Sequence, residues 1–349
     1  MGYSIRQFQL SADKDDLFEL WEAVLLNSNQ ERMRRMYSDN SYGVPLSWLV
    51  ISDEEAKPVG SVSAFPRQLI VEGAEYRMGV NCDMLMLKAH RTLGPALMAL
   101  KSLIKGCSGQ GYHFILAMPN KKSQPVFKRV GYKKIGTAYR WTKILRSEEK
   151  LSRYIKYVFL QKTMSRCIDD FLNYISFESW IRIWRYKLWN YISHEKNEPI
   201  EKAQFIDEID FSPELGTTSG FLKWRYSKSI CKGNPSIFNV SCNQNIIGLI
   251  VYTLNDTEVI VQDAIFIHDD EKEAELLVSK FIHKMRSLGY ASISVLHFGA
   301  EHFEKLLQKF GFIKRGGRDV FVNDLSVKTP SHLPMIFKKI SWFEGTLDL

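Results

Sequence analysis

Two stretches of this chain, 180 residues apart, repeat one pattern. The first is Phe127–Gly136 and the second is Leu307–Gly316. Each follows a strand-like run that begins at a Gly-Tyr pair, at Gly111-Tyr112 and at Gly289-Tyr290. In both copies an amphipathic helix ends at a glycine, which adopts the left-handed conformation at little cost, and an aromatic residue then opens a strand. The repeat predicts a chain that uses one fold twice.

One copy has a turn that suits a phosphate group. Residues Arg91–Ala96 follow an apolar run, Val80–Leu87, and precede Ala96–Lys105, whose apolar residues recur at helical spacing. Pro95 stands where helices begin and Gly106 where they end. Such a helix N-terminus directs backbone N–H groups and the positive end of the helix dipole at one point, which suits a pyrophosphate. The alternative is an ordinary strand-to-helix turn.

Two motifs of the first copy occur in the order of a known family. Arg91, Gly94 and Ala96 form the pattern Arg-x-x-Gly-x-Ala, and Asn120 with Ser123 precedes a short helix that closes in Gly-Tyr. Residues 1 to about 145 therefore resemble the GCN5-related N-acetyltransferase (GNAT) family. The resemblance implies that the turn holds the pyrophosphate of coenzyme A. It also implies that the splayed fourth and fifth strands admit the pantetheine arm.

By this resemblance the cofactor is acetyl-CoA or another acyl-CoA. The residues implied in binding it are Arg91, Thr92, Leu93, Gly94, Ala96, Asn120, Ser123 and Phe127. Two positions depart from the family pattern. Pro95 has no N–H, so one donor is missing from the turn. Phe127 stands where many members have a tyrosine as general acid, and a phenyl ring cannot protonate a leaving thiolate.

Acyl transfer to an amine requires a base for the amine proton and a donor for the carbonyl oxygen. The fourth strand offers Asn81, Cys82 and Asp83, and His90 follows it. We expect Asp83 to be the general base, acting through a water, because partial burial makes a carboxylate more basic. A structural hydrogen bond or ion pair is the alternative for Asp83. Histidine titrates nearer to neutral pH, but His90 lies beside the turn. We interpret Cys82 as an inert buried thiol.

The composition is that of a globular chain with two domains. The chain has 349 residues, of which 45% are hydrophobic and 25% are charged. No apolar run approaches the ~18 residues needed to cross a bilayer, and Met1–Arg6 forms neither a signal peptide nor a myristoylation site. We therefore expect a cytoplasmic protein. The five cysteines form no Cys-x-x-Cys pair, so we expect neither structural disulfides nor a metal site.

The net charge of +8 favours an anionic partner. The candidates are coenzyme A, an acidic substrate, a membrane surface and nucleic acid. Lys121-Lys122 and Lys128-Arg129 lie near the predicted coenzyme A site, where they would attract the 3′-phosphate. The alternative is a solvated basic face.

The segment between the copies is rich in aromatic residues. Leu151–Ser193 holds eleven aromatics among 43 residues and has no Gly or Pro, so it predicts helix. We expect a helical bridge that packs Trp180 and Trp184 between two domains. A basic amphipathic surface on an anionic membrane is the first alternative, and nucleic-acid binding by stacking is the second.

The second copy differs from the first at the turn. His268-Asp269-Asp270-Glu271 stands where the first copy has Arg-x-x-Gly-x-Ala, and three carboxylates would repel a pyrophosphate. We therefore expect this copy to wall the acceptor cleft and to stabilise the first copy, without binding coenzyme A. The run Phe221–Tyr226 is similar to the same point in tandem acyltransferases encoded with bacterial surface-polysaccharide pathways. Core packing also explains Trp224 and Tyr226.

The predicted fold is α+β, with two tandem acyltransferase-like domains of mixed sheets joined by an aromatic-rich helical segment. The predicted units are a coenzyme A-binding domain at 1–147, a helical bridge at 148–198 and a degenerate domain at 199–349. Periodicity also predicts two antiparallel pairs in the first copy. Their strands are Trp48–Ile51 with Val59–Phe65, and Gln68–Val71 with Tyr76–Met86.

The predicted activity is N-acyl transfer from coenzyme A, with acetyl as the expected group. The acceptor is a primary amine, for which an amino sugar or a glycan-linked amine is the leading class. Two alternatives stay open: a non-catalytic acyl-CoA-binding or scaffold protein, and an acyltransferase fed by an acyl carrier protein. Nucleic acid is not expected as a partner. Peripheral contact with the inner membrane face through residues 151–193 stays open, and the sequence does not indicate the oligomeric state.

Overall fold

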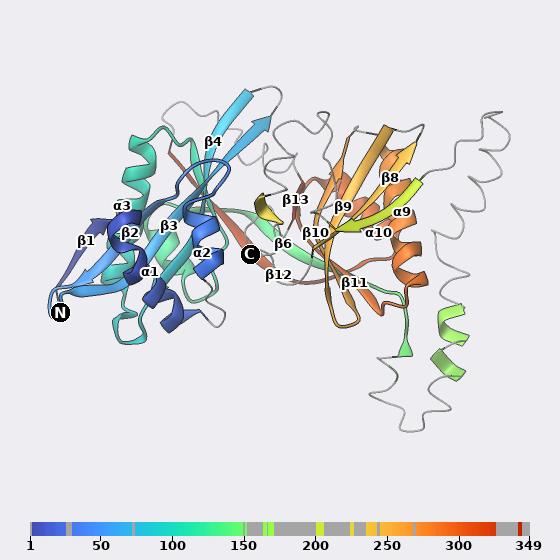
Figure 1. Ribbon diagram of the computed structural model, residues 1–349, viewed down its shortest axis with the longest axis horizontal. Coiled ribbons are helices and arrows are strands. Elements are labelled where there is room, and N and C mark those ends of the chain that lie inside the picture. Colours follow the sequence, from blue (N-terminus) through green and yellow to red (C-terminus); the bar gives the residue numbers. More distant parts are fainter. Residues whose placement is uncertain are drawn as a thin grey trace.

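The structure of the protein is a computed structural model. It describes residues 2–25, 30–71, 74–148, 151, 163–165, 167–170, 200–205, 224–226, 235–242, 245–267, 270–325 and 341–343. The two copies lie beside each other along the long axis of the molecule, and long strands cross between them (Figure 1).

The described strands and helices of each copy have the following bounds. The first copy contains β1 (Tyr3–Gln7), α1 (Leu10–Val24), α2 (Gln30–Tyr37), β2 (Leu46–Ser52), β3 (Lys57–Val71), β4 (Ala74–Met86), the 3-10 turn η1 (Lys88–His90), α3 (Leu93–Gly109), β5 (Phe114–Ala117), α4 (Gln124–Arg129) and β6 (Lys133–Ile144). The second copy contains β7 (Ile200–Phe205), β8 (Ser236–Cys242), β9 (Asn245–Asn255), β10 (Glu258–Phe266), α9 (Glu271–Ser287), β11 (Ser292–Gly299), α10 (Glu301–Lys309), β12 (Ile313–Asp324) and β13 (Ser341–Phe343).

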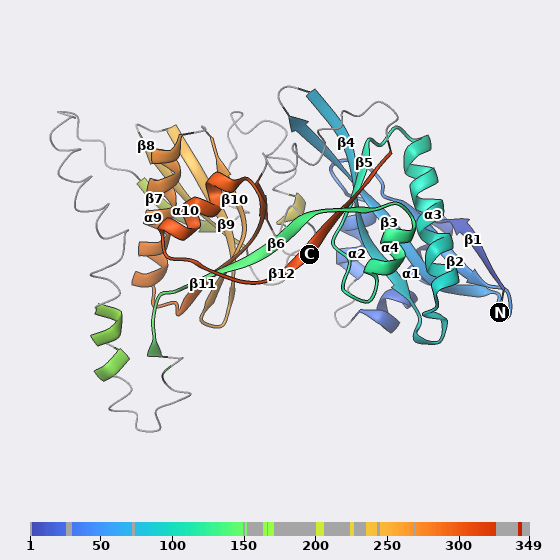
Figure 2. The ribbon, with the colours of Figure 1, turned by 180° about the vertical axis from the view of Figure 1, so that it is seen from behind.

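All of these strands belong to one mixed sheet. Its order is β1-β2-β3-β4-β5-β12-β6-β11-β10-β9-β8-β7, and β13 pairs with β11. The pairs β4–β5 and β10–β11 are parallel. In the first copy α1 and α2 cover one face of the sheet, and α3 and α4 cover the other (Figures 1 and 2). The α+β class with mixed pairing is therefore confirmed.

The last strands of the two copies are exchanged. β12 lies between β5 and β6, and β6 in turn pairs with β11. Ala117 of β5 pairs with Phe321 of β12, and Val295 of β11 pairs with Trp141 of β6. The registers are equivalent because Phe321 and Trp141 stand at the same position of the repeat, and Ala117 and Val295 each follow the glycine of their Gly-Tyr pair by six residues. Phe321 is buried in the core under α3, and Trp141 is buried in the core of the second copy. Each copy therefore completes the hydrophobic core of the other.

The glycines of the repeat confirm one expectation and correct another. Gly131 and Gly311 have φ of 94° and 76°, as expected for a left-handed helix end. Gly106 was expected to end its helix, but α3 continues to Gly109. A Cβ at Gly106 would overlap the indole ring of Trp48. This glycine therefore allows close packing of α3 on β2, a role that the local sequence does not reveal.

Other boundaries differ by a few residues. β3 is one strand from Lys57 to Val71, where the pattern indicated two runs, and its pairing with β4 closes at Val71 and Ala74. α3 begins at Leu93, three residues before the expected start. No helix in the described ranges is long and apolar enough to cross a membrane. Most of the aromatic segment 151–193, with Trp180 and Trp184, lies outside the described residues, so its packing and membrane contact stay predictions.

Candidate functional site

The first copy has an opening between β4 and β5. The two strands pair in parallel from Met78 with Phe114 to Asn81 with Ala117, and their pairing then ends although β4 continues to Met86. Beyond this point no strand of the described residues pairs with β4 on the side that faces β5, which leaves room for an extended ligand.

A β-bulge in β4 lies next to this opening. Ser63 of β3 pairs with Cys82, but Ser61 pairs with Leu85, so the register shifts across Asp83. Asp83 has φ of 50°, in the left-handed region that a non-glycine residue rarely occupies. The bulge therefore places Asp83 two residues past Asn81, the last residue of β4 that pairs with β5.

The turn at residues 91–96 starts α3 beside this opening. The side chain of the N-cap residue Thr92 makes no capping hydrogen bond. A Cβ at Gly94 would meet no atom within 4 Å, and Leu93 is 41% exposed. Arg91 Nε donates to the Met86 carbonyl oxygen at 2.9 Å, which ties the turn to the end of β4. The helix N-terminus is thus open to an anion, with Pro95 removing one donor.

The equivalent opening in the second copy is filled by the chain itself. The pairing of β10 with β11 ends at Val261 and Val295. Beyond it, β13 pairs with β11 from His297 with Phe343 to Gly299 with Ser341, and β13 also lies against β10. A strand therefore occupies the place that is open between β4 and β5.

The helix after this filled opening is also closed to anions. Asp270 caps α9 by accepting a hydrogen bond from the Lys272 backbone N–H at 2.7 Å, and Glu271 and Glu273 stand in the first turn. These carboxylates complement the helix dipole and would repel a phosphate. His268 and Asp269, the first two residues of the run His268–Glu271, lie outside the described residues.

Solved structures share this architecture over nearly the whole chain. A GCN5-related N-acetyltransferase from Anabaena variabilis has a TM-score of 0.63 and 12% identity, covering 93% of this chain and 74% of that one. One from Kribbella flavida has a TM-score of 0.57 and 10% identity, covering 93% and 72%. A tandem GNAT protein from the clavulanic acid biosynthesis pathway has a TM-score of 0.52 and 8% identity, covering 94% and 100%. The chain has the tandem GNAT fold. No protein-family model matches its sequence, and no curated protein matches it either.

In this GNAT fold, Asn120 and Ser123 form the turn that leads into α4. Asn120 Oδ1 accepts from the backbone N–H groups of Lys122 and Ser123, each at 3.0 Å. Ser123 Oγ donates to the Asn120 carbonyl oxygen at 3.1 Å. These bonds give both side chains a structural role at the end of β5. Their contact with coenzyme A stays a prediction.

Phe127 is a residue of α4, and its side chain lies in the hydrophobic core of the first copy. Its side chain is 3% exposed, and its ring stands edge-to-face with Tyr132 at a centroid distance of 5.0 Å. Contact of Phe127 with coenzyme A stays a prediction.

We expect Phe127→Tyr to lower stability by about 1–3 kcal/mol, because a hydroxyl placed in this apolar core would lose its hydration. Acetyl-CoA affinity should stay unchanged in the folded variant. Thermal unfolding and calorimetry measure the two effects. A stable variant with faster acyl transfer would show instead that the hydroxyl reaches the site.

His90 joins three parts of the first copy. It is buried, its Nδ1 lies 3.1 Å from the Tyr3 hydroxyl, and its Nε2 lies 2.7 Å from Glu55 Oε1. The hydrogen bond from His90, followed by that from Lys57, lowers the pKa of Glu55. Both ring nitrogens are thus engaged by β1 and by the turn between β2 and β3. This geometry favours a role in holding the loop before α3, and a catalytic role for His90 stays a prediction.

Asp83 has a partner that the sequence did not indicate. The Tyr37 hydroxyl, at the end of α2, donates to Asp83 Oδ2 at 3.0 Å. Burial, followed by the negative charge of Asp83, raises the pKa of Tyr37 well above its ordinary value, so the phenol stays protonated. One signal was present: Asp83 and Asp263 are 180 residues apart, the spacing of the repeat, and Asp263 accepts from the Tyr226 hydroxyl at 3.1 Å.

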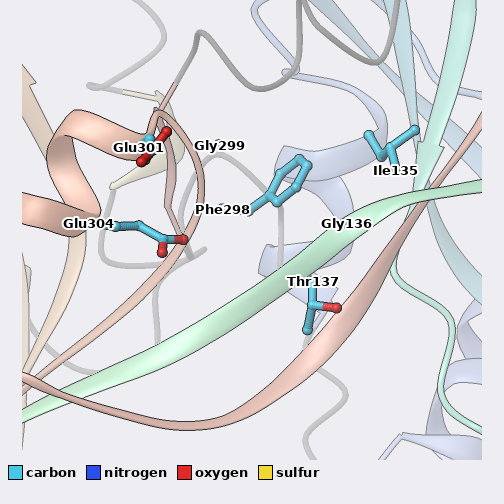
Figure 3. Close-up of a pocket in the computed structure, with 7 residues that line it drawn as sticks. All are labelled: Ile135, Gly136, Thr137, Phe298, Gly299, Glu301 and Glu304. Carbon is cyan, nitrogen blue, oxygen red and sulfur yellow. The ribbon is translucent and has the colours of Figure 1, made fainter.

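A separate cavity of about 330 Å³ lies where β6 passes β11 and α10. It is lined by Ile135, Gly136, Thr137, Phe298, Gly299, Glu301 and Glu304. Figure 3 shows Glu301 and Glu304 projecting from α10, across from Thr137 on β6. Its carboxylates disfavour a pyrophosphate, so the opening beside α3 is the better candidate for coenzyme A.

Proposed function

We propose that the protein is an N-acyltransferase that moves an acyl group, acetyl in the first instance, from coenzyme A to a primary amine. The observation that carries this proposal is the contrast between the copies. The opening between β4 and β5 adjoins a helix N-terminus whose N-cap side chain leaves its donors uncapped, whereas β13 and Asp270 occupy the equivalent places in the second copy.

Each part of the first copy has a role in this reaction. Acetyl-CoA supplies the activated acyl group. The α3 N-terminus binds the pyrophosphate, and the edges of β4 and β5 bind the extended pantetheine arm. Asp83, at the bulge, takes through a water the proton that the amine loses as it attacks the carbonyl carbon. The buried Phe127 cannot donate a proton, so water protonates the leaving thiolate.

We further propose an amino sugar or a glycan-linked amine as the acceptor class. This rests on the similarity of Phe221–Tyr226 to tandem acyltransferases of surface-polysaccharide pathways. Of this run the structure describes Trp224–Tyr226, and the burial of Trp224 and Tyr226 also fits plain core packing.

The activity is tested in two steps. Mass spectrometry of the purified protein first shows whether it retains an acyl-CoA. A thiol-release assay with acetyl-CoA then compares amino sugars, polyamines and amino acids, with the corresponding N-acetylated amines as controls. Thiol release that depends on a free amine supports the proposal. Tight acetyl-CoA binding without thiol release for any amine would instead favour a non-catalytic binding protein. Transfer from acyl carrier protein alone would favour an acyltransferase that uses an acyl carrier protein as its donor.

We expect one molecule of acetyl-CoA to bind per chain, because only the opening of the first copy is free of a strand in the described structure. Isothermal titration calorimetry measures the stoichiometry. Hydrogen exchange should show protection at residues 91–96 and not at the start of α9. Two equivalent sites would contradict the interpretation of β13 and Asp270.

A further inference from the structure

A chain of hydroxyl groups ends on the Asp83 carboxylate. Ser47 Oγ donates to Ser63 Oγ at 2.8 Å, and the Ser63 and Tyr37 hydroxyls are 2.8 Å apart. Because Tyr37 uses its proton to donate to Asp83, its oxygen accepts from Ser63. Ser47, Ser63 and Tyr37 are buried, so each bond in the chain polarises the next in a medium of low dielectric.

The carboxylate at the end of this chain is attached to a strained backbone. Asp83 has φ of 50°, in the left-handed region that destabilises a non-glycine residue. A charge-assisted hydrogen bond contributes in the opposite direction. The bond from Tyr37 therefore both offsets the strain and limits the directions in which the carboxylate can point.

We propose that Tyr37 is a positioning residue, which holds the Asp83 carboxylate at the β4–β5 opening as the base for the acceptor amine. The inference rests on the proposed acyl transfer. It assigns a role in that reaction to a residue of α2, outside both sequence motifs.

The second copy holds the end of α2 in place. Trp224 Nε1 donates to the backbone carbonyl oxygen of Arg35 at 3.0 Å, two residues before Tyr37. The guanidinium carbon Cζ of Arg67 lies over the Trp224 ring, 5.1 Å from the ring centroid. The second copy thereby supports the geometry of the base although its own opening is filled.

The same tyrosine–aspartate pair in the second copy offers a matched control. The Tyr226 hydroxyl donates to Asp263 Oδ2 at 3.1 Å, and β10 also has a bulge, between Val261 and Asp263. Tyr226→Phe removes the same kind of bond from Asp263, the aspartate that stands where Asp83 does in the repeat. Because β13 fills that opening, the control reports what the bond does for the fold alone.

The sign of the expected pH effect follows from the bond. The titratable groups beside the Tyr37–Asp83 pair include the thiol of Cys82, the neighbour of Asp83 in β4. Tyr37 donates, so it favours the charged carboxylate. A base acts when it is deprotonated, and the rate therefore rises with pH through its titration. Loss of the donor should move this rising limb to higher pH.

The test compares wild type, Tyr37→Phe and Tyr226→Phe. Carbon-13 NMR of aspartate-labelled protein without ligand follows the Asp83 carboxyl, which is assigned by its absence in Asp83→Asn. We expect Tyr37→Phe to raise its titration midpoint by about one pH unit. The rising limb of the pH profile of kcat/KM should move by the same amount, measured with acetyl-CoA and the amine identified above. The value of kcat should fall about tenfold. Tyr226→Phe should leave both unchanged.

Other outcomes separate this inference from the proposed function. If wild type transfers the acyl group and Tyr37→Phe changes neither the pH profile nor the titration midpoint of Asp83, the role of Tyr37 is overturned and the proposed function is not. Equal shifts in Tyr226→Phe overturn it as well, because they would reflect the fold. Wild type that binds acetyl-CoA but transfers no acetyl group overturns the proposed function and the inference together. If Tyr37→Phe does not fold, Ser63→Ala removes the group that Tyr37 accepts from, and should shift the midpoint in the same direction by less.

Discussion

Gly94→Asp should abolish acetyl-CoA binding while the protein keeps its fold. A side chain at Gly94 meets no atom within 4 Å, and an acidic residue near the start of α3 complements the helix dipole. The new negative charge would repel a bound pyrophosphate. Two unit charges 4 Å apart interact by about 4 kcal/mol at an effective dielectric constant of ~20, or about three orders of magnitude in Kd. Calorimetry measures the affinity, and thermal unfolding confirms the fold.

The same helix provides the control for this prediction. Gly109, at the other end of α3, also has no atom within 4 Å of an added Cβ. It lies about 22 Å from Gly94 along the helix axis at 1.5 Å per residue. Gly109→Asp should therefore bind acetyl-CoA as wild type does. Gly94→Asn separates bulk from charge, since it adds a side chain of similar size. Unchanged affinity in a folded Gly94→Asp protein would place the pyrophosphate elsewhere.

A fragment of residues 1–148 should form a dimer, because the first copy alone lacks the strand that completes its sheet. β12 supplies that strand in the full chain, and Phe321 fills the core beneath α3. The strand β6 of a second fragment has the equivalent residue, Trp141, at the equivalent register against β11. Two fragments can therefore exchange β6 strands around a two-fold axis, in the way that β6 and β12 pair in the full chain. Light scattering after size-exclusion chromatography measures the mass.

A charged residue in the exchanged strand tests the geometry of this dimer. Trp141→Asp in the fragment would place a carboxylate in the core of the partner fragment, so it should prevent the dimer. Lys133→Asp, at the start of the same strand on an exposed residue, should not. A folded monomeric fragment would contradict the prediction, since it would show that β5 does not need a strand from another copy.

Local features of the fold were predictable because short segments determine them. The left-handed ends at Gly131 and Gly311, and the presence of a hairpin between β3 and β4, depend on residues within a few positions of one another. The strand, turn and helix around Gly94 were predictable for the same reason. Gly106 was not, because its role depends on Trp48, which β2 places against α3.

The candidate site divides in the same way. The motif around Arg91–Ala96 and the choice of Asp83 came from residue types along one segment, and the structure places both next to the β4–β5 opening. The bond from Tyr37 to Asp83 joins residues 46 positions apart in the sequence. Residue type and spacing say nothing of such a contact until α2 is packed on the sheet.

The sequence by itself determined that one fold is used twice, that the copies differ at the helix after the fourth strand, and where the turn that we predict to bind phosphate lies in the first copy. Only the tertiary structure decided that β6 and β12 are exchanged and that β13 fills the opening of the second copy. The physical reason is that the alternation of a strand encodes which faces are buried and not which strand lies beside it. That choice depends on the edges and hydrophobic surfaces that the rest of the chain leaves uncovered.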